Sequence, residues 1–494
     1  MGTRCATALG AVFIASIGFV ATAASPVATD PATGIAPVED SDFYRNGRFS
    51  QDQVELGRLL FFDKILSGNK NIACASCHHP TLGTSDAVAL SFGEGAVGLG
   101  RQRRPTADRP LLGRVPRNAQ ALYFLGAREF ARLFHDGRLE ADATLDWQSG
   151  FWSPAREQLP PGLDNVLAAQ AMFPVLSPIE MAGHKGENEI ATAVALDRLD
   201  GPDGAWALIA RRLQAIPTYV ALFKRAFPEI AHAEDITFVQ AANAIAAFET
   251  VAFRPDDSPF DRYIETRDPE VLTPAARRGL TLFYGEAGCA SCHSGKFQTD
   301  QDFHAIAMPQ IGPGKNDGWD QSYWRASGFM ARLEDQGRGR VTSRPEDRYR
   351  FRTPSLRNVA LSGPWGHDGA YGTLEEVVRH HLDPLGGLER YRVASAGLAP
   401  LPHVLERTGQ GSRLIYRPVN PARLADYQRR DAWVQGNESL RSAIAAANEL
   451  APVAMSDGEV RDLVAFLEAL TDPRSRDRRD LIPARVPSGL AVDD

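Results

Sequence analysis

The sequence predicts a mainly α-helical fold with two related halves, long loops and little β structure. Three observations lead to this prediction. Apolar residues recur at helical spacing in several segments, whereas the alternation typical of strands is sparse. The pentapeptide Cys-Ala-Ser-Cys-His occurs twice, at residues 74–78 and again at residues 289–293. A segment with a helix-capping pattern precedes each copy.

Each pentapeptide has the C-x-x-C-H spacing that attaches a c-type haem. Its two thiols can form thioethers to the haem vinyl groups, and its imidazole can bind the iron. A thioredoxin-like redox pair needs no trailing histidine, and a four-thiolate zinc site would need a second C-x-x-C pair nearby. We therefore predict two cytochrome c-type haem domains. Their haem-binding residues would be Cys74, Cys77 and His78, and Cys289, Cys292 and His293.

The composition is that of an ordinary globular protein large enough for two or three domains. The chain has 494 residues, of which 44% are apolar and 23% are charged. Its formal net charge is −7, to which haem propionates would add. This charge disfavours nucleic acid and anionic membranes as partners and favours a small basic redox protein.

The first 23 residues have the pattern of a secretory signal peptide. Arg4 precedes the apolar run 9–20, and small residues follow up to Ala23, after which we expect cleavage. An uncleaved membrane anchor is the alternative, because residues 6–25 nearly reach a spanning length. Cys5 would leave with the signal, so the other four cysteines are the haem thiols. Such a protein would be periplasmic, with no membrane contact after cleavage.

After the signal peptide we expect a leader, and then a helix before each haem motif. Residues 24–40 are interpreted as a flexible leader. A helix over residues 51–62, capped at Ser50, leads into the first motif. The helix before the second motif starts at Pro274 and is capped by Thr273. The two motifs thus have the same kind of lead-in.

Two further helical segments complete the pattern. Residues 236–253 form an apolar helical stretch, and the Pro- and Asp-rich run 254–259 after it marks a domain boundary. Near the end of the chain, Ser456 and Glu459 form a capping box, and the helix that follows stops at Pro473. A helix before the haem motif that crosses another far behind it is the minimal cytochrome c arrangement.

We expect an amino-terminal haem domain over residues 41–255 and a carboxy-terminal one over residues 256–475. A surface tail over residues 476–494 would follow. Loop-rich insertions cover residues 147–164 and 384–451, and no chemistry is evident in them. A weak internal repeat supports two related halves. Its members are Arg117-Asn118 with His135-Asp136-Gly137, and Arg357-Asn358 with His367-Asp368-Gly369.

In these features the sequence resembles the bacterial di-haem cytochrome c peroxidase family, including its MauG-like branch, over about residues 42–472. The resemblance implies reduction of H2O2 at the amino-terminal haem. The carboxy-terminal haem would collect electrons from a small cytochrome c or cupredoxin, and a homodimer is common among such proteins. The runs that carry the resemblance are Glu55–Asp63, Arg117–Asn118, Phe134–Arg138, Pro178–Met181, Phe260–Tyr263 and Phe351–Asn358.

Cleavage of an iron-bound hydroperoxide needs an open distal position and a group that moves a proton between the two oxygens. Glu180 matches the family's distal glutamate, and Gln170 matches its hydrogen-bonding companion. The apolar residues 173–176 favour a partly desolvated carboxylate. A surface glutamate in a loop is the alternative interpretation.

The sequence departs from the family pattern at Glu94. Many such peroxidases have a histidine in this loop, which caps the first iron until the second haem is reduced. We therefore expect a first haem that is five-coordinate or water-bound as isolated, as in the MauG-like branch. His79 is too near His78 to reach the opposite face of the haem.

The outer ligand of the second haem is usually methionine, or tyrosine in MauG. That position falls on His381, in a helix expected over residues 373–381. His380 is the register alternative, and Met308 is a methionine alternative. A haem with two histidine ligands has a lowered potential, which would favour highly oxidised states.

The resemblance also implies a Ca²⁺ site between the haems. Its ligands would be the Asn118 side chain and the carbonyls of Ser362 and Pro364, although an ordinary asparagine turn is the alternative. His135 stands where the family often has a tryptophan electron relay, and imidazole is much harder to oxidise. His367 would form hydrogen bonds near the second haem, in a structural or a functional role.

Two rival functions stay open. One is a MauG-like oxidase that modifies a partner protein through long-range electron transfer. The other is a non-enzymatic di-haem electron carrier or sensor. An open iron with a distal carboxylate argues against a pure carrier, because carriers usually saturate both irons.

Overall fold

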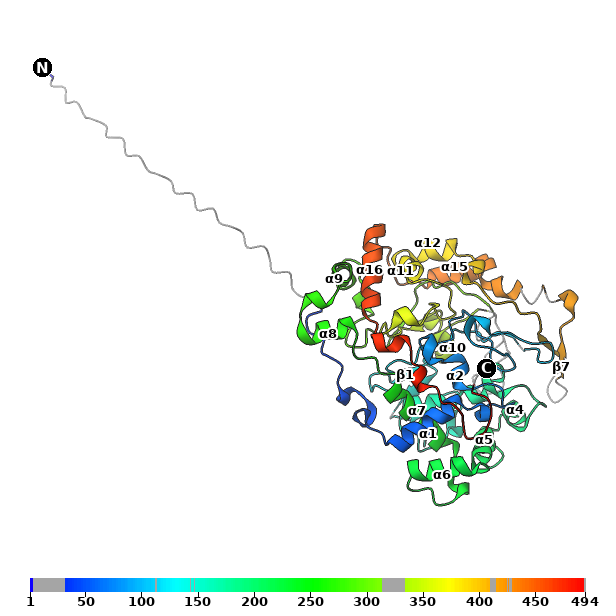
Figure 1. Ribbon diagram of the computed structural model, residues 1–494. Coiled ribbons are helices and arrows are strands. Elements are labelled where there is room, and N and C mark those ends of the chain that lie inside the picture. The colour runs from blue at the N-terminus through cyan, green and yellow to red at the C-terminus, as the bar shows by residue number, and fades with distance from the viewer. Residues whose placement is uncertain are drawn as a thin grey trace.

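The described part of the chain is mainly helical, as predicted, with three small antiparallel sheets (Figure 1). No helix within it is long and apolar enough to cross a membrane. The expected signal peptide lies almost wholly outside it. The computed structural model describes residues 1–2, 32–312 except 112, 143 and 146, 334–408, and 415–492 except 424 and 426–428.

Two long helices cross near the first haem motif. They are α1 (Gln51–Phe62) and α7 (Phe238–Ala252), which lie at one end of the molecule (Figure 1). A Cβ atom on Gly57 would lie 1.8 Å from the carbonyl oxygen of Ala244, so only glycine permits this close approach. Phe61 and Phe248 fill the contact, with ring centres 5.3 Å apart.

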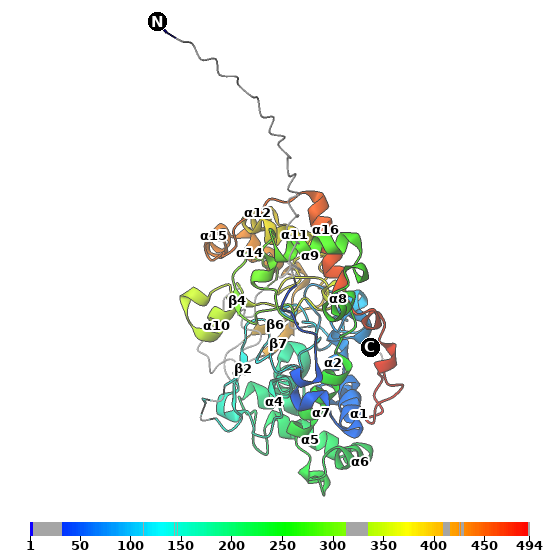
Figure 2. The same cartoon turned by 90° about the vertical axis from the view of Figure 1, so that its left-hand side faces the viewer.

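A second crossing lies near the other motif. Here α9 (Pro274–Tyr284) packs against α16 (Asp457–Ala469), at the opposite end of the molecule (Figures 1 and 2). Gly279 permits the approach, because a Cβ atom there would lie 1.9 Å from the carbonyl oxygen of Asp462. Both expected helix pairs are therefore present, one beside each haem motif.

Shorter elements connect these pairs. The other α-helices are α2 (Cys74–Cys77), α3 (Val166–Ala171), α4 (Glu189–Ala195), α5 (Ala205–Gln214), α6 (Pro217–Ala226), α8 (Pro259–Thr266), α10 (Arg338–Thr342), α11 (Leu374–Leu382), α12 (Pro384–Arg390), α14 (Trp433–Gly436) and α15 (Glu438–Ala446). The antiparallel sheets are β1 (Arg132–Leu133), β2 (Leu139–Ala141) and β3 (Phe151–Trp152); β4 (Phe303–His304) with β5 (Phe351–Arg352); and β6 (Leu405–Thr408) with β7 (Ile415–Pro418).

The two members of the internal repeat meet between the two halves. The amide of Asn118 donates to the carbonyl of His367 (2.9 Å), and the amide of Arg352 donates to that of His135 (2.8 Å). The two members of the internal repeat therefore contact each other in the folded chain.

Both chain ends of the folded region pack more closely than expected. Ala32 is buried, and Arg267 donates to the carbonyls of Ala32 (3.1 Å) and Ile35 (2.7 Å). These bonds place Ala32 and Ile35 against the end of α8, within the segment for which the sequence predicted a flexible leader.

The expected surface tail is also anchored. Val486 is buried in the amino-terminal core. The hydroxyl of Ser488 donates to the Asp63 carboxylate (2.6 Å), and Arg58 donates to the carbonyl of Leu481 (3.2 Å). The tail therefore covers the first helix pair and does not extend into solvent.

The insertion over residues 384–451 contains more regular structure than its loop-rich sequence suggested. It includes α12, α14, α15 and the β6–β7 pair. Leu111 joins it to the amino-terminal half, donating to the carbonyl of His403 (3.0 Å) and accepting from the amide of Leu405 (2.6 Å).

Candidate functional site

A cavity in the amino-terminal half contains the first haem motif. Apolar side chains from α1, α3 and α7 form much of its wall. An apolar hollow with two thiols and an imidazole on its wall fits a covalently attached haem. The predicted site residues that line it are Cys74, Cys77, His78, Asn118, His135, Gln170 and Glu180.

The imidazole of each motif is oriented by a backbone carbonyl. Nδ1 of His78 lies 3.1 Å from the carbonyl oxygen of Thr84, and Nδ1 of His293 lies 3.2 Å from that of Gln298. Because a carbonyl only accepts, Nδ1 carries the proton and Nε2 is left to bind metal. Burial lowers the pKa of His78, and that of His293 to about 4, so both rings are neutral as metal binding requires.

A π-helical turn, Pro178–Ala182, carries Glu180 to the cavity wall. The carbonyl of Ser177 accepts hydrogen bonds from the three successive amides of residues 180–182. A Cβ atom on Gly93 would lie 1.9 Å from the carbonyl oxygen of Ile179. The loop after the first motif therefore packs directly against the turn that holds Glu180.

Glu94 is not among the residues that line this cavity. Its carboxylate accepts hydrogen bonds from the side-chain amides of Asn69 (2.8 Å) and Asn71 (2.6 Å), and burial raises its pKa. Among the described residues that line the cavity, the histidines are His78 and His135. Position 94 thus holds a carboxylate that is bound by two side-chain amides.

His135 is held by the backbone beside the cavity. Its Nε2 donates to the carbonyl of Asn118 (3.2 Å). Burial lowers the pKa of this imidazole to about 3, which keeps it neutral. A neutral, buried ring hydrogen-bonded to a carbonyl is a poor substitute for an oxidisable indole.

The second motif faces His381, on α11. Nδ1 of His381 donates to the carbonyl of Val377 (2.8 Å), which leaves Nε2 free. The ring centres of His293 and His381 lie 6.5 Å apart. With metal–imidazole bonds of about 2 Å, an iron between two such rings would hold their centres about 6 Å apart. The pair therefore fits one iron ion.

The alternative ligands fit less well. Both ring nitrogens of His380 are engaged, with the hydroxyl of Tyr371 (2.9 Å) and the carbonyl of Ile306 (2.8 Å). Met308 is buried in a separate apolar cluster with Tyr371. His367 stacks on Phe351 with ring centres 3.8 Å apart, which indicates a packing role.

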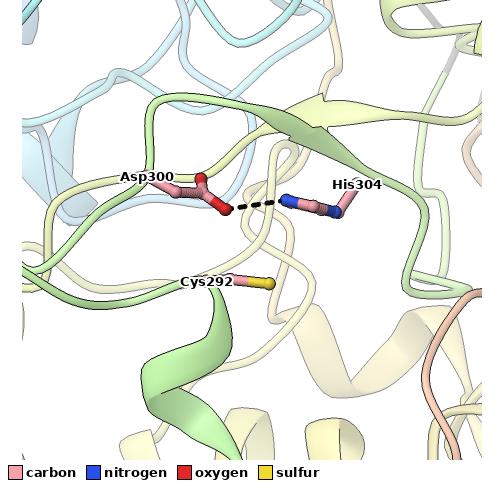
Figure 3. A group of neighbouring side chains, drawn as sticks. All are labelled: Cys292, Asp300 and His304. Carbon is pink, nitrogen blue, oxygen red and sulfur yellow. Dashed lines mark hydrogen bonds and ion pairs between the residues drawn. The ribbon is translucent and has the colours of Figure 1, made fainter.

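A cluster beside the second motif resembles a metal site. Ligand atoms of Cys292, Asp300 and His304 lie within 4.8 Å of one another, and Nε2 of His304 donates to the Asp300 carboxylate at 2.9 Å (Figure 3). Thioether formation with haem consumes the Cys292 thiolate. We therefore assign no separate metal ion to this cluster.

Glu249 was not predicted from the sequence. It lines the first cavity from α7, and burial raises its pKa to about 8. Its sequence signal is a single carboxylate within the apolar helix 238–252. Burial of a carboxylate on an apolar helix costs more free energy than exposure of one at the surface, so a single acid in such a helix is a candidate functional residue.

Comparison with known proteins shows the family to which the chain belongs. Residues 51–269 match the family model of di-haem cytochrome c peroxidase. Methylamine utilization protein MauG of Methylorubrum extorquens is 30% identical over 342 residues, which cover 69% of this chain and 70% of that protein. The chain belongs to the di-haem cytochrome c peroxidase family. It is a di-haem peroxidase, an oxidoreductase with two covalently bound haem c groups.

Other members of the di-haem cytochrome c peroxidase family are similar over much of the chain. Cytochrome c551 peroxidase of Pseudomonas aeruginosa is 28% identical over 334 residues, which cover 68% of this chain and 72% of that protein. The diheme peroxidase BthA of Burkholderia thailandensis has the same fold, with a TM-score of 0.53. That structural match, at 22% identity, covers 93% of this chain and 94% of BthA.

Proposed function

We propose that this protein is a periplasmic peroxidase that reduces H2O2 to water at the haem attached by the first motif. A small cytochrome c or cupredoxin would supply the electrons. The observation that carries the proposal is the meeting of Gln170 and Glu180 with His78 at one cavity. The apolar run 9–20 supports export, and the two helix crossings support haem domains over residues 41–255 and 256–475.

The side chains around the first cavity have separate tasks. The haem supplies the iron to which peroxide binds and through which electrons reach it. His78, whose Nδ1 is hydrogen-bonded to the Thr84 carbonyl, would hold the iron through Nε2. Glu180 takes the proton of the inner peroxide oxygen and delivers it to the outer oxygen as the O–O bond breaks. Gln170 orients the peroxide by hydrogen bonding.

The second site stores electrons. His293 and His381 would both hold its iron, and this haem would supply electron storage and not peroxide binding. Two electrons and two protons convert one H2O2 into two H2O. A second redox centre beside the first allows both electrons to be delivered while the donor protein supplies one at a time.

The expected Ca²⁺ site remains part of the proposal. Nδ2 of Asn118 donates to the carbonyls of Val88 (2.7 Å) and Ala89 (3.2 Å), so Oδ1 is left to bind a cation. A Cβ atom on Gly369 would lie 2.6 Å from Cα of Ala89 and 3.0 Å from Cγ of Pro364. The segments that carry the expected ligands therefore lie close together. Carbonyls of Ser362 and Pro364, with water, would complete an oxygen-only set.

Metal analysis after gel filtration in calcium-containing buffer tests this site. We expect one Ca²⁺ per wild-type chain and a loss of most of it in Asn118→Ala. Wild-type protein that retains no Ca²⁺ would contradict the assignment.

Substitution of Glu180 tests the proposed chemistry. In steady-state H2O2 reduction, Glu180→Gln should lower kcat by about 10²–10⁴-fold, the usual contribution of general acid–base catalysis. Haem content and the absorption spectrum should stay unchanged.

Glu187→Gln is the matched control, because Glu187 lies near the same turn, hydrogen-bonded to Asn69 (2.9 Å), and is absent from the cavity lining. Its turnover should equal that of the wild type. Full turnover in Glu180→Gln with both haems bound would refute the assignment.

A MauG-like oxidase is the second candidate. The 30% identity to MauG and the carboxylate at position 94 favour it. Oxidation of a co-expressed partner protein, without turnover on any cytochrome or cupredoxin donor, would select this function over the first.

A further inference from the structure

A buried tyrosine and histidine form a hydrogen-bonded pair beside the second haem site. The hydroxyl of Tyr371 lies 2.9 Å from Nδ1 of His380. Tyr371 is 8% exposed and His380 2% exposed. Neither residue is used in the peroxide chemistry described above.

This pair lies next to the proposed iron ligand. The rings of His380 and His381 have centres 6.1 Å apart, and those of His380 and Tyr371 are 5.2 Å apart. The aromatic rings thus lead from the second haem site to the phenol in two short steps.

The direction of the hydrogen bond follows from the other side of the imidazole. Nε2 of His380 lies 2.8 Å from the carbonyl oxygen of Ile306. A carbonyl only accepts, so Nε2 carries the proton and Nδ1 is a bare acceptor. Tyr371 therefore donates its hydroxyl proton to Nδ1, at a distance within the range of about 2.6–3.2 Å for proton transfer.

Such a contact changes what the phenol can do. Removal of an electron from a phenol makes its proton strongly acidic, so oxidation is easiest where a base receives that proton at once. We propose that Tyr371 is a redox-active residue that gives one electron to the second haem while its hydroxyl proton moves to His380.

The step is balanced and rests on the proposed function. The oxidant is the second haem after it has lost an electron to the peroxide reaction at the first. Tyr371 loses one electron and one proton and becomes a neutral tyrosyl radical. The haem gains the electron, and His380 gains the proton. Return of one electron from the donor, with the proton from His380, restores the phenol.

Tyr391 provides a natural comparison. It is 5% exposed, and its ring centre lies 5.6 Å from that of Tyr371. Its hydroxyl donates to the carbonyl of Ala370 (2.9 Å), which is not a base for a phenol proton. By the same reasoning, Tyr391 stays reduced, so that the radical is confined to one of two neighbouring tyrosines.

Rapid freeze-quench electron paramagnetic resonance of the two-haem protein mixed with H2O2 tests this inference. The wild type should give a narrow tyrosyl signal whose hyperfine pattern changes after growth on ring-deuterated tyrosine. Tyr371→Phe should lose the signal, and the matched control Tyr391→Phe should retain it. Unchanged haem absorption spectra in both resting variants would show that the haem sites are intact.

Two results would overturn the inference and leave the proposed function standing. One is a haem spectrum that responds to peroxide without a tyrosyl signal at any quench time. The other is a tyrosyl signal that survives in Tyr371→Phe. If peroxide changes neither the haem spectrum nor the radical signal, the proposed function fails as well.

Discussion

Backbone carbonyls set the tautomer of the imidazoles at the two proposed haem sites. The carbonyls of Thr84, Gln298 and Val377 each accept a hydrogen bond from Nδ1 of a histidine. In the proposed sites, Nε2 of each of these histidines would bind an iron. Burial keeps these rings neutral, which a metal ligand requires. The same reasoning separates His381, with one nitrogen free, from His380, which uses both.

Glu249 should make stability depend on pH. Its folded-state pKa of about 8 lies above that of an unfolded glutamate, because burial disfavours the charged form. The folded state therefore holds the proton more tightly between about pH 4.5 and 8, and stability falls as pH rises through this window.

Glu249→Gln removes this dependence. We expect the variant to lose less thermal stability than the wild type between pH 6 and pH 8, by on the order of 1 kcal/mol or more. Thermal melts of the two proteins at both pH values measure the difference. Parallel losses of Tm in both proteins would contradict the assigned burial cost.

Some of these residues were predictable from sequence, and others were not. The haem-binding residues follow from the spacing C-x-x-C-H, which is local. Glu180 and His381 needed the family resemblance, since a loop glutamate and a histidine pair carry no specific signal alone. The Tyr371–His380 contact depends on how α11 packs against the preceding turn, which periodicity does not reveal.

At the level of elements, each haem motif lies beside a crossing of two helices that only glycine permits. Gly57 and Gly279 both face a backbone carbonyl of the partner helix. The caps at Ser50, Thr273 and Ser456 start three of these four helices where the sequence predicted. Capping is a local property, so it could be read directly from the sequence.

Gly279→Ala should destabilise the second crossing. The new methyl group would lie 1.9 Å from the carbonyl oxygen of Asp462, so α9 and α16 must move apart. Overpacking of this kind costs about 1–3 kcal/mol. Thermal unfolding should show a lowered Tm, together with a changed absorption band of the second haem.

Gly458→Ala is the control within the same helix pair, because its nearest neighbour would be 3.7 Å from the added methyl group. This variant should melt at or slightly above the wild-type temperature. Equal Tm values for both variants would show that the crossing does not depend on Gly279.

At the level of the whole molecule, buried charge joins the two halves. Arg117 pairs with Asp136 (2.8 Å) from its own half and with Asp335 (2.7 Å) from the other. These contacts link residues far apart in the sequence, so no local pattern predicted Asp335. The packed leader and tail were missed for the same reason, since short apolar segments gain order only from the surface they cover.

The two proposed haem sites thus share the same pentapeptide and differ in the residues around it. In the proposed account, Glu94 and Glu180 would leave one face of the first iron open beside an acid, whereas His381 would close the second. The asymmetry arises outside the two identical pentapeptides, and it separates the proposed site of peroxide reduction from the proposed electron store.

Electron paramagnetic resonance of the purified, fully oxidised protein tests this asymmetry most directly. We predict one high-spin ferric signal from the haem at His78 and one low-spin signal typical of two imidazole ligands. His381→Ala should remove the low-spin signal and keep the other. Two low-spin haems without a high-spin component in the wild type would contradict the account.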